Sequence, residues 1–203
     1  MTTLKFYKKA STYLCGKDKK LAKIIKQHEL SPLELHEDYF RELTESIIGQ
    51  QLSVKAADTI LKRFYALITE PLNPKKVIAI KDDKIRAAGI SWSKISYIKD
   101  LAKRFADGEI EVGRFDKMTD EEIIEELVRV RGIGRWTAEM FLIFGLGRPD
   151  VFSFGDLGLR RAIEKVHGIK ELGETDAMKI SETWKPYRSV ASRYLWKSLD
   201  NKG

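Results

Sequence analysis

The chain has 203 residues and 43% of them are hydrophobic, so it is long enough for one sizeable core or two small lobes, and disorder is not expected. No run approaches the roughly 18 apolar residues that cross a bilayer, and residues 1–9 lack the apolar stretch of a secretory signal. The single cysteine, Cys15, excludes an internal disulfide and the common zinc and iron–sulfur sites. Lys and Arg number 37 against 30 Asp and Glu, and the net charge of +7 suits a polyanionic partner without identifying one.

Helical periodicity runs along almost the whole chain. Apolar residues recur every three or four positions, which predicts amphipathic helices and an all-α protein. Only residues 151–154 read as a plausible extended piece. The periodic positions are Phe40, Leu43 and Ile47, then Val54, Ala57, Leu61, Phe64 and Ile68, then Ile95, Ile98, Leu101, Ala102 and Phe105.

Caps and breakers mark the helix ends. Ser53 can cap a helix that starts at Val54, and Thr119 with Glu122 forms a capping box. Clusters of Gly and Pro separate about ten short helices. These connections fall near residues 71–74, 89–93, 108–115, 145–149, 168–173 and 186.

Two further segments carry unusual patterns. Residues 46–57 read Ser-Ile-Ile-Gly-Gln-Gln-Leu-Ser-Val-Lys-Ala-Ala, which by itself is best explained as a corner between helices where glycine allows close packing. Residues 88–102 read Ala-Gly-Ile-Ser-Trp-Ser-Lys-Ile-Ser-Tyr-Ile-Lys-Asp-Leu-Ala.

A glycine-tipped helical hairpin is predicted over residues 127–138. Gly132 and Gly134 stand between two helix-forming segments, and glycine permits positive φ and a close backbone approach. The second helix then begins at once, so its N–H groups can receive a phosphate. For an isolated Gly-x-Gly a structural αα-turn is the better explanation, but the full pattern Leu-x-x-x-x-Gly-Ile-Gly-x-x-Thr-Ala is more specific and favours phosphate binding. Three arginines lie near the tip: Arg129, Arg131 and Arg135.

A lone carboxylate follows the hairpin in a loop rich in glycine and proline. Asp156 stands where a new helix is expected to begin and run to Gly168. A helix N-terminus favours an ionised carboxylate, which could stabilise an oxocarbenium-like sugar or activate water. Asp is also a preferred N-cap, so Asp156 taken alone is better explained as a structural cap. Its place in a loop rich in glycine and proline, just after the hairpin helix, favours catalysis instead.

The four segments, in this order, resemble the helix-hairpin-helix DNA glycosylase superfamily, and most of all its 3-methyladenine DNA glycosylase II type, in a compact form without the N-terminal β-sheet domain of larger relatives. The resemblance spans about residues 35 to 200. It implies an all-α fold with two helical lobes flanking a DNA-facing cleft. We expect one glycosylase unit over residues 1–203, with the wedge in a lobe of roughly 35–120, and the hairpin and catalytic Asp in a lobe of roughly 121–203 plus the N-terminal helices.

The resemblance also assigns roles to single residues. It makes Asp156 the catalytic aspartate and Asp150 the loop's earlier acid, and it leaves either Gln51 or Leu52 as the wedge that fills the space of an extruded base. We favour Gln51, with Ser53 beside it facing the minor groove. The expected contacts to the DNA backbone are Gly132, Ile133, Gly134, Arg135 and Thr137. A monovalent cation, Na⁺ or K⁺, is expected at the carbonyls of Val130, Arg131 and Ile133, and no other cofactor is expected.

Aromatic residues suggest the base pocket. Trp136 and Trp196 match pocket positions of the alkyl-base enzymes, whereas Trp184 is expected in the core. N3- and N7-alkylated purines are cationic, and cations stack favourably on aromatic faces. The remaining pocket positions are Met140 and Leu157, where some relatives carry aromatic residues.

The function implied is a monofunctional DNA glycosylase that releases alkylated bases of the 3-methyladenine and 7-methylguanine class. The strand-cutting members carry a lysine where this chain has Trp136, so we expect no lyase activity. Two alternatives remain: a non-catalytic helix-hairpin-helix DNA-binding module, and a glycosylase for another damaged base. We expect a monomer that binds damaged double-stranded DNA, in the cytoplasm at the nucleoid of a prokaryote or in the nucleus of a eukaryote. The histidines, His28, His36 and His167, match no ligand spacing and are read as incidental.

Overall fold

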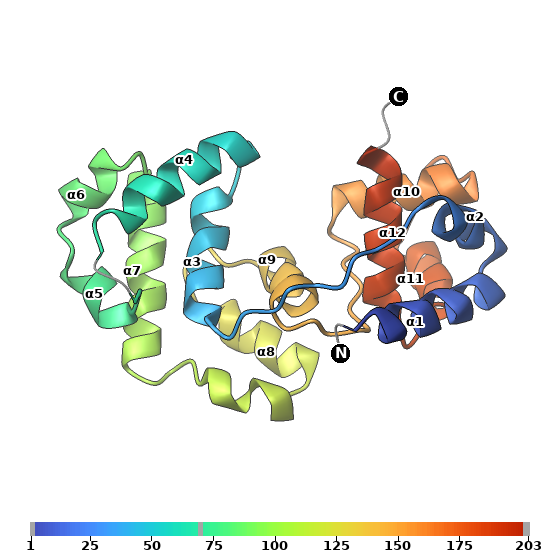
Figure 1. Ribbon diagram of the computed structural model, residues 1–203, viewed down its shortest axis with the longest axis horizontal. Coiled ribbons are helices and arrows are strands. Elements are labelled where there is room, and N and C mark those ends of the chain that lie inside the picture. Colours follow the sequence, from blue (N-terminus) through green and yellow to red (C-terminus); the bar gives the residue numbers. More distant parts are fainter. Residues whose placement is uncertain (1–2, 69–70, 201–203) are drawn as a thin grey trace. The chain divides into compact units, whose positions relative to one another are not determined.

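The computed structural model describes residues 3–68 and 71–200, and within them it contains helices and connecting loops without a strand (Figure 1). The chain separates into two compact units, one of residues 1–35 and 142–203 and the other of residues 36–141. The all-α fold class predicted from periodicity is confirmed. Residues 151–154 are irregular loop rather than a strand.

The central unit, residues 36–141, is built around a long helix, α7. It packs against α5 and α3, and its residues Ile95, Ile98 and Leu101 are fully buried or nearly so. Among the described residues the elements are α3 (Tyr39–Gly49), α4 (Val54–Tyr65), α5 (Pro74–Ala79), α6 (Asp82–Ala87), α7 (Trp92–Ala106), the 3₁₀ helix η1 (Val112–Lys117), α8 (Asp120–Leu127) and α9 (Arg135–Met140).

The terminal unit joins the two ends of the chain. Its helices α2, α10 and α12 contact one another, although α2 is separated from the others by more than a hundred residues. The described elements are α1 (Leu4–Lys17), α2 (Lys19–Gln27), α10 (Leu157–His167), α11 (Glu174–Glu182) and α12 (Arg188–Asp200). A π-helical turn, η2 (Phe141–Gly145), begins at the last residue of the central unit.

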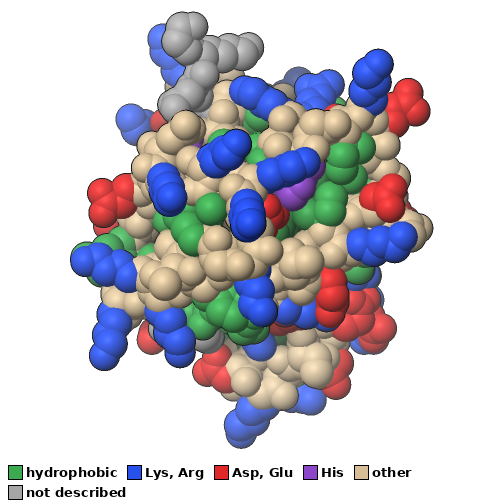
Figure 2. Space-filling view, turned by 90° about the vertical axis from the view of Figure 1, so that its right-hand side faces the viewer, with side chains coloured by type: hydrophobic (Ala, Val, Ile, Leu, Met, Phe, Trp, Pro, Cys, Tyr) green, Lys and Arg blue, Asp and Glu red, His purple; other side chains and the backbone are tan. Residues whose placement is uncertain are grey.

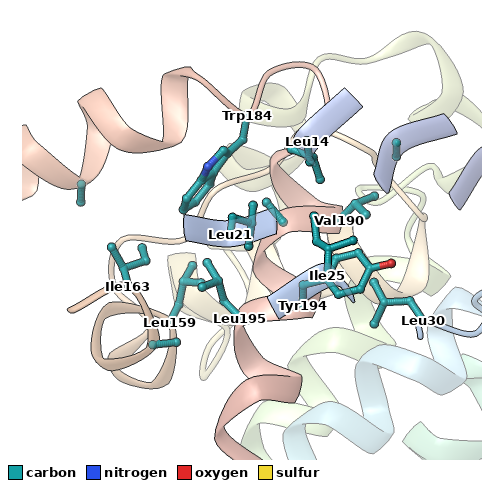
Figure 3. Close-up of a cluster of buried hydrophobic side chains, with 14 of the residues drawn as sticks. Leu14, Leu21, Ile25, Leu30, Leu159, Ile163, Trp184, Val190, Tyr194 and Leu195 are labelled. Atoms are coloured by element: carbon teal, nitrogen blue, oxygen red, sulfur yellow. The ribbon is translucent and has the colours of Figure 1, made fainter. Parts of the chain in front are cut away.

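The core of the terminal unit gathers around Trp184, which has no exposed surface (Figure 3). Its indole N–H donates a hydrogen bond to Asp18 at 2.9 Å, so the buried polar group has a partner. The core position expected for Trp184 is therefore confirmed. The labelled side chains around it include Leu14, Leu21, Ile25, Leu159, Ile163, Val190 and Leu195.

The division between the units differs from the expected boundary near residue 120. Residues 121–141, which hold the hairpin, group with the central unit. The reason is local packing: the Arg131 N–H donates to the Asp100 carboxylate at 2.9 Å, and the Gln50 amide donates to the Gly132 carbonyl at 2.9 Å. Hairpin and expected wedge thus belong to one unit, and Asp156 belongs to the other.

The predicted caps are present. The Ser53 hydroxyl accepts a hydrogen bond from the Ala56 N–H, and Thr119 with Glu122 forms a complete capping box. The apolar stripe expected on α4 is only partly buried, because Phe64 is in the core whereas Val54 is 80% exposed. The first turn of α4 therefore presents an apolar surface to solvent.

Basic side chains are spread across the face that Figure 2 shows, and acidic ones lie mostly toward its margins. This distribution accompanies the net charge of +7. In the described part of the chain, each helix is too short or too polar to cross a membrane.

Candidate DNA-binding and catalytic site

The tip of the hairpin needs its first glycine. Gly132 has φ +82°, and a Cβ built there would lie 2.1 Å from the Tyr97 ring. Only glycine therefore fits the left-handed backbone and the ring stacked on it. Gly134 differs, because its φ is −92° and no heavy atom lies within 4 Å of the position that a Cβ would take. Its backbone is open to an approaching partner.

Two of the three arginines near the tip, Arg131 and Arg135, lie beside acidic side chains. Arg135 forms two hydrogen bonds of 2.7 Å to Glu121 and one of 3.0 Å to Glu139, yet its side chain is 58% exposed. The pKa of Arg135 is raised, first of all by Glu121. Arg131 is also exposed and lies 3.6 Å from Asp100. Their charge is thus partly balanced, and Arg135 would have to exchange a carboxylate for a phosphate to contact DNA.

The side chain of Thr137 does not lie on the surface, where a contact to DNA would require it. Its side chain is buried, at 5% exposure, in the first turn of α9. Ile133 is buried as well, at 3%. Of the five expected backbone contacts, these two can reach a phosphate only through their main-chain atoms.

A tight turn joins α3 to α4 and carries the expected wedge. Gln51 has φ +58°, which is uncommon for a residue with a side chain and marks a locally strained backbone. Gln51 and Leu52 are both exposed, and the Leu52 N–H bonds to the Gly49 carbonyl at 3.1 Å. The Ser53 side chain serves as the cap of α4.

This turn borders a pocket of about 490 Å³ in the central unit. Trp136, 47% exposed, contributes to its wall, so the structure brings one expected pocket residue together with both wedge candidates. Apolar and polar groups both line it, as in many ligand sites. The lining residues are Ser46, Gly49, Gln50, Gln51, Leu52, Trp136 and Thr137.

Asp156 begins α10 in the terminal unit. Its Oδ1 accepts a hydrogen bond from the Leu159 N–H at 2.5 Å, so Asp156 is the N-cap of the helix. The same oxygen also accepts a hydrogen bond from the Trp196 indole N–H at 2.8 Å. Two donors on one oxygen fix the orientation of the carboxylate. The structural and catalytic interpretations of Asp156 are therefore compatible, because the cap also presents the carboxylate in one defined position.

Trp196, which donates to this carboxylate, packs beside a second aromatic ring on the same unit. Trp196 is half-buried, and its ring lies 5.7 Å from that of Phe144, which is 41% exposed. The space beside Gly158 is small, because a Cβ there would lie 3.2 Å from Asp156 Oδ1 and 3.7 Å from the Trp196 ring, and glycine leaves this space open. Leu157 is 50% exposed. This surface can accept a flat apolar or cationic ring next to a carboxylate.

Asp150 has a structural partner. Its carboxylate forms hydrogen bonds of 2.9 Å to both Nε and the terminal Nη2 of Arg188, and its backbone carbonyl accepts a third at 2.7 Å. Both side chains are mostly buried. Asp150 therefore fastens the loop before Asp156 to the start of α12, the helix that carries Trp196.

The expected pocket residues are divided between the units. Trp136 and Met140 belong to the central unit, and Trp196 and Leu157 to the terminal unit. Met140 is partly buried at the end of α9. In residues 3–68 and 71–200, no group of three or more His, Cys, Asp or Glu side chains is placed to hold a metal ion.

Sequence reasoning missed Phe144, Lys94, Tyr97 and Asp100. Phe144 lies in an apolar run that reads as core, and it points outward where the helix widens into the π turn η2. Lys94 and Tyr97 occur in the quoted segment 88–102, but spacing alone does not reveal their partners. These partners, at Gln50 and Gly132, lie in turns distant from α7 along the chain.

The fold and the ordered set of hairpin, aspartate and turn define a class of DNA repair protein. Residues 44–187 match the HhH-GPD superfamily base excision DNA repair protein family. The chain belongs to that family.

Particular relatives agree. The Bacillus subtilis protein YfjP is 32% identical over 188 residues, which cover 89% of this chain and 66% of the relative. A crystal structure of a DNA-3-methyladenine glycosidase from Bacillus halodurans superposes with a TM-score of 0.86 at 33% identity, covering 95% of this chain and 89% of that one. The structure of a Schizosaccharomyces pombe 3-methyladenine DNA glycosylase in complex with abasic DNA superposes with a TM-score of 0.81 at 33% identity, and the match covers 94% of this chain and 96% of that one.

Proposed function

We propose that the protein is a monofunctional DNA glycosylase that extrudes alkylated bases, of the 3-methyladenine and 7-methylguanine class, and hydrolyses their glycosidic bond to initiate base excision repair. The observation that carries the proposal is the Asp156 carboxylate, held by the Leu159 and Trp196 N–H groups beside an exposed aromatic surface. The relatives named 3-methyladenine glycosylases support the choice of substrate.

The chemistry follows from charge. In an alkylated purine the ring already carries positive charge, so it departs with the electrons of the C1′–N bond without needing a general acid. The sugar then develops oxocarbenium character, which the negative Asp156 stabilises, and water adds at C1′ while its proton passes to the Asp156 carboxylate. A cationic ring also binds well on the faces of Trp196 and Phe144.

Binding of the duplex is assigned to the central unit. We propose that the open backbone at Gly134 meets a phosphate, that Arg135 supports it, and that Gln51 or Leu52 enters the base stack. The turn carbonyls suit a monovalent cation by their chemistry. Val130 already accepts the Ile133 N–H at 3.1 Å, but a carbonyl oxygen has a second lone pair for a cation. We expect the protein to act where the DNA is, in the nucleoid or in the nucleus, and as a monomer.

The test of this function is base release from methylated DNA, measured by chromatography of the soluble fraction. Free 3-methyladenine or 7-methylguanine is expected with the wild-type chain, and none with Asp156→Asn, which keeps an N-cap and should bind an abasic duplex as tightly as the wild type. An active Asp156→Asn variant would contradict the assignment. Binding by the wild type without any release would favour a DNA-binding module, and a panel of single-lesion duplexes would reveal a different damaged base.

Lyase activity is tested separately. A strand-cutting enzyme forms a Schiff base with an amine, whereas Trp136 stands at the lysine position of such enzymes. We expect borohydride to trap no covalent complex with damaged DNA and the product strand to stay intact until the abasic site is cleaved chemically. A trapped complex would refute the monofunctional assignment.

A further inference from the structure

The end of α3 is closed by a lysine from another helix. The ammonium group of Lys94, on α7, donates hydrogen bonds to the carbonyls of Ile48 at 2.8 Å and Gln50 at 2.6 Å. Carbonyls at the C-terminus of a helix lack partners within it, and a cation there also faces the negative end of the helix dipole. The two bonds fix the backbone immediately before Gln51.

The same turn is fastened on a second side. The Gln50 side-chain amide donates to the Gly132 carbonyl at 2.9 Å, so the wedge turn and the hairpin tip are joined directly. The hairpin tip in turn rests on α7, through the Tyr97 ring below Gly132 and through Asp100, which accepts the Arg131 N–H. Burial alone would raise the pKa of Asp100, but the Arg131 N–H and Arg104 outweigh it and lower the pKa.

Lys94, Tyr97 and Asp100 follow one another at intervals of three on α7, and residues three apart share a helix face. This face of α7 therefore contacts both the wedge turn and the hairpin tip, which are the two elements that the proposed function places on DNA. The proposed function gives the face itself no contact with DNA. The segment 88–102 thereby acquires a physical meaning. It positions the wedge turn and the hairpin tip against each other.

We propose that Lys94 is a positioning residue for base extrusion: its two bonds hold the Gln50–Gln51 backbone in the strained shape that presents the wedge. The proposal rests on the proposed glycosylase function. A wedge that is ordered beforehand fills the gap of an extruded base at a lower cost in free energy. For a disordered wedge, the cost of ordering it is added to the cost of unstacking the base. Loss of Lys94 should slow extrusion and leave phosphate binding almost unchanged.

The chain offers a matched control on the same helix. Lys99 donates to the carbonyls of Ile78 at 2.7 Å and Ile80 at 2.5 Å, and so closes the end of α5 as Lys94 closes the end of α3. Its side chain is 21% exposed. Lys99 also lies 3.4 Å from the Asp82 carboxylate. Lys94→Met and Lys99→Met therefore both delete an ammonium group bound to two carbonyls at a helix end, and Lys99→Met removes a partly exposed ion pair in addition, but only Lys94 contacts the turn that carries Gln51.

The experiment uses the full chain and the single-lesion duplex that the wild type processes fastest. Single-turnover base release, stopped-flow fluorescence of a 2-aminopurine beside the lesion, and affinity for an abasic duplex are measured well below the unfolding temperature of each variant. Lys94→Met deletes two charge-assisted hydrogen bonds, and we expect the part of their free energy that is lost in the extruded state to equal about one such bond, which slows both extrusion and release roughly 10- to 100-fold, with affinity within about threefold. Lys99→Met should keep rates close to wild type despite a similar or larger loss of thermal stability, since it also removes the ion pair with Asp82.

Rescue separates the amine from general damage. In a Cys15→Ser background, Lys94→Cys should be slow, and aminoethylation of the thiol, which restores an amine at the same reach, should recover most of the rate. Equal slowing at positions 94 and 99, or wild-type rates for Lys94→Met, would overturn the proposal. A wild-type chain that releases no base from any duplex would instead refute the proposed function, so the two failures are distinct.

Discussion

Single residues in this protein carry two tasks at once, and Asp156 is the main example. As the N-cap it satisfies the Leu159 N–H, and as an ordered carboxylate it is the proposed catalytic group. Gly132 likewise combines a left-handed backbone with contact to the Tyr97 ring. Such positions tolerate few substitutions, because a replacement has to meet two physical requirements.

The two glycines of the hairpin tip should therefore respond differently to alanine. Gly132→Ala should lower the free energy of unfolding by about 2 kcal/mol or more, because a Cβ meets the Tyr97 ring and a left-handed residue costs roughly 1–2 kcal/mol. Gly134→Ala should cost less than about 1 kcal/mol but weaken DNA binding roughly tenfold, if a phosphate approaches this backbone. Denaturant unfolding measures the loss of stability, and fluorescence anisotropy measures the loss of DNA affinity. A Gly134→Ala variant that binds DNA as tightly as the wild type would show that the tip does not bind DNA through Gly134.

At the scale of secondary-structure elements, the loop that leads into α10 is joined to the start of α12 by hydrogen bonds. The loop before α10 carries Asp156, and it is held to the beginning of α12 by Asp150 and Arg188 and by the Ser189 hydroxyl, which accepts the Val151 N–H at 2.9 Å. Since α12 also carries Trp196, the two groups that we propose act at the reacting sugar, Asp156 and Trp196, both depend on this one junction. The contacts of Asp150 thus give the earlier acid of the loop a structural role.

Asp150→Asn should consequently lower stability by about 2 kcal/mol, the typical contribution of hydrogen bonds to a charged partner, and slow base release without changing phosphate binding. Glu182→Gln is the control, because its ion pair with Lys185 is mostly exposed and contributes little. Thermal unfolding and single-turnover release at one temperature give the comparison. Release at the wild-type rate would mean that the loop keeps its shape without the clamp.

At the scale of the whole molecule, the chain closes its terminal unit by bringing its two ends together. Asp18, 9% exposed, caps α2 through the N–H groups of Lys20 and Leu21 and accepts the Trp184 indole N–H. His167 Nε2 lies 3.3 Å from its Oδ2. Burial would raise the pKa of Asp18, but the His167 ring, the Leu21 N–H and the Trp184 N–H outweigh it and hold the pKa well below its usual range.

This lowered pKa predicts the direction of a pH effect. A carboxyl group whose pKa is lower in the folded state adds stability above its unfolded pKa of roughly 4, and that stability is lost as the pH falls through the lower folded value. Asp18→Asn should lose about 2 kcal/mol at pH 7, and the difference from wild type should shrink toward pH 3. Asp38→Asn, at the more exposed cap of α3, is the control and should show little change. A difference that is constant with pH would contradict the assignment.

The sequence by itself determined the helices, their caps and the order of the motifs, because periodicity, capping and turn chemistry are local properties of neighbouring residues. It also placed Asp156 at a helix start and Trp184 in the core. Only the tertiary structure decided which unit holds the hairpin, that Trp196 donates to Asp156, that Arg135 is paired with Glu121, and that Lys94 closes α3. These contacts join residues distant along the chain, and their geometry depends on how the helices pack, which no local pattern records.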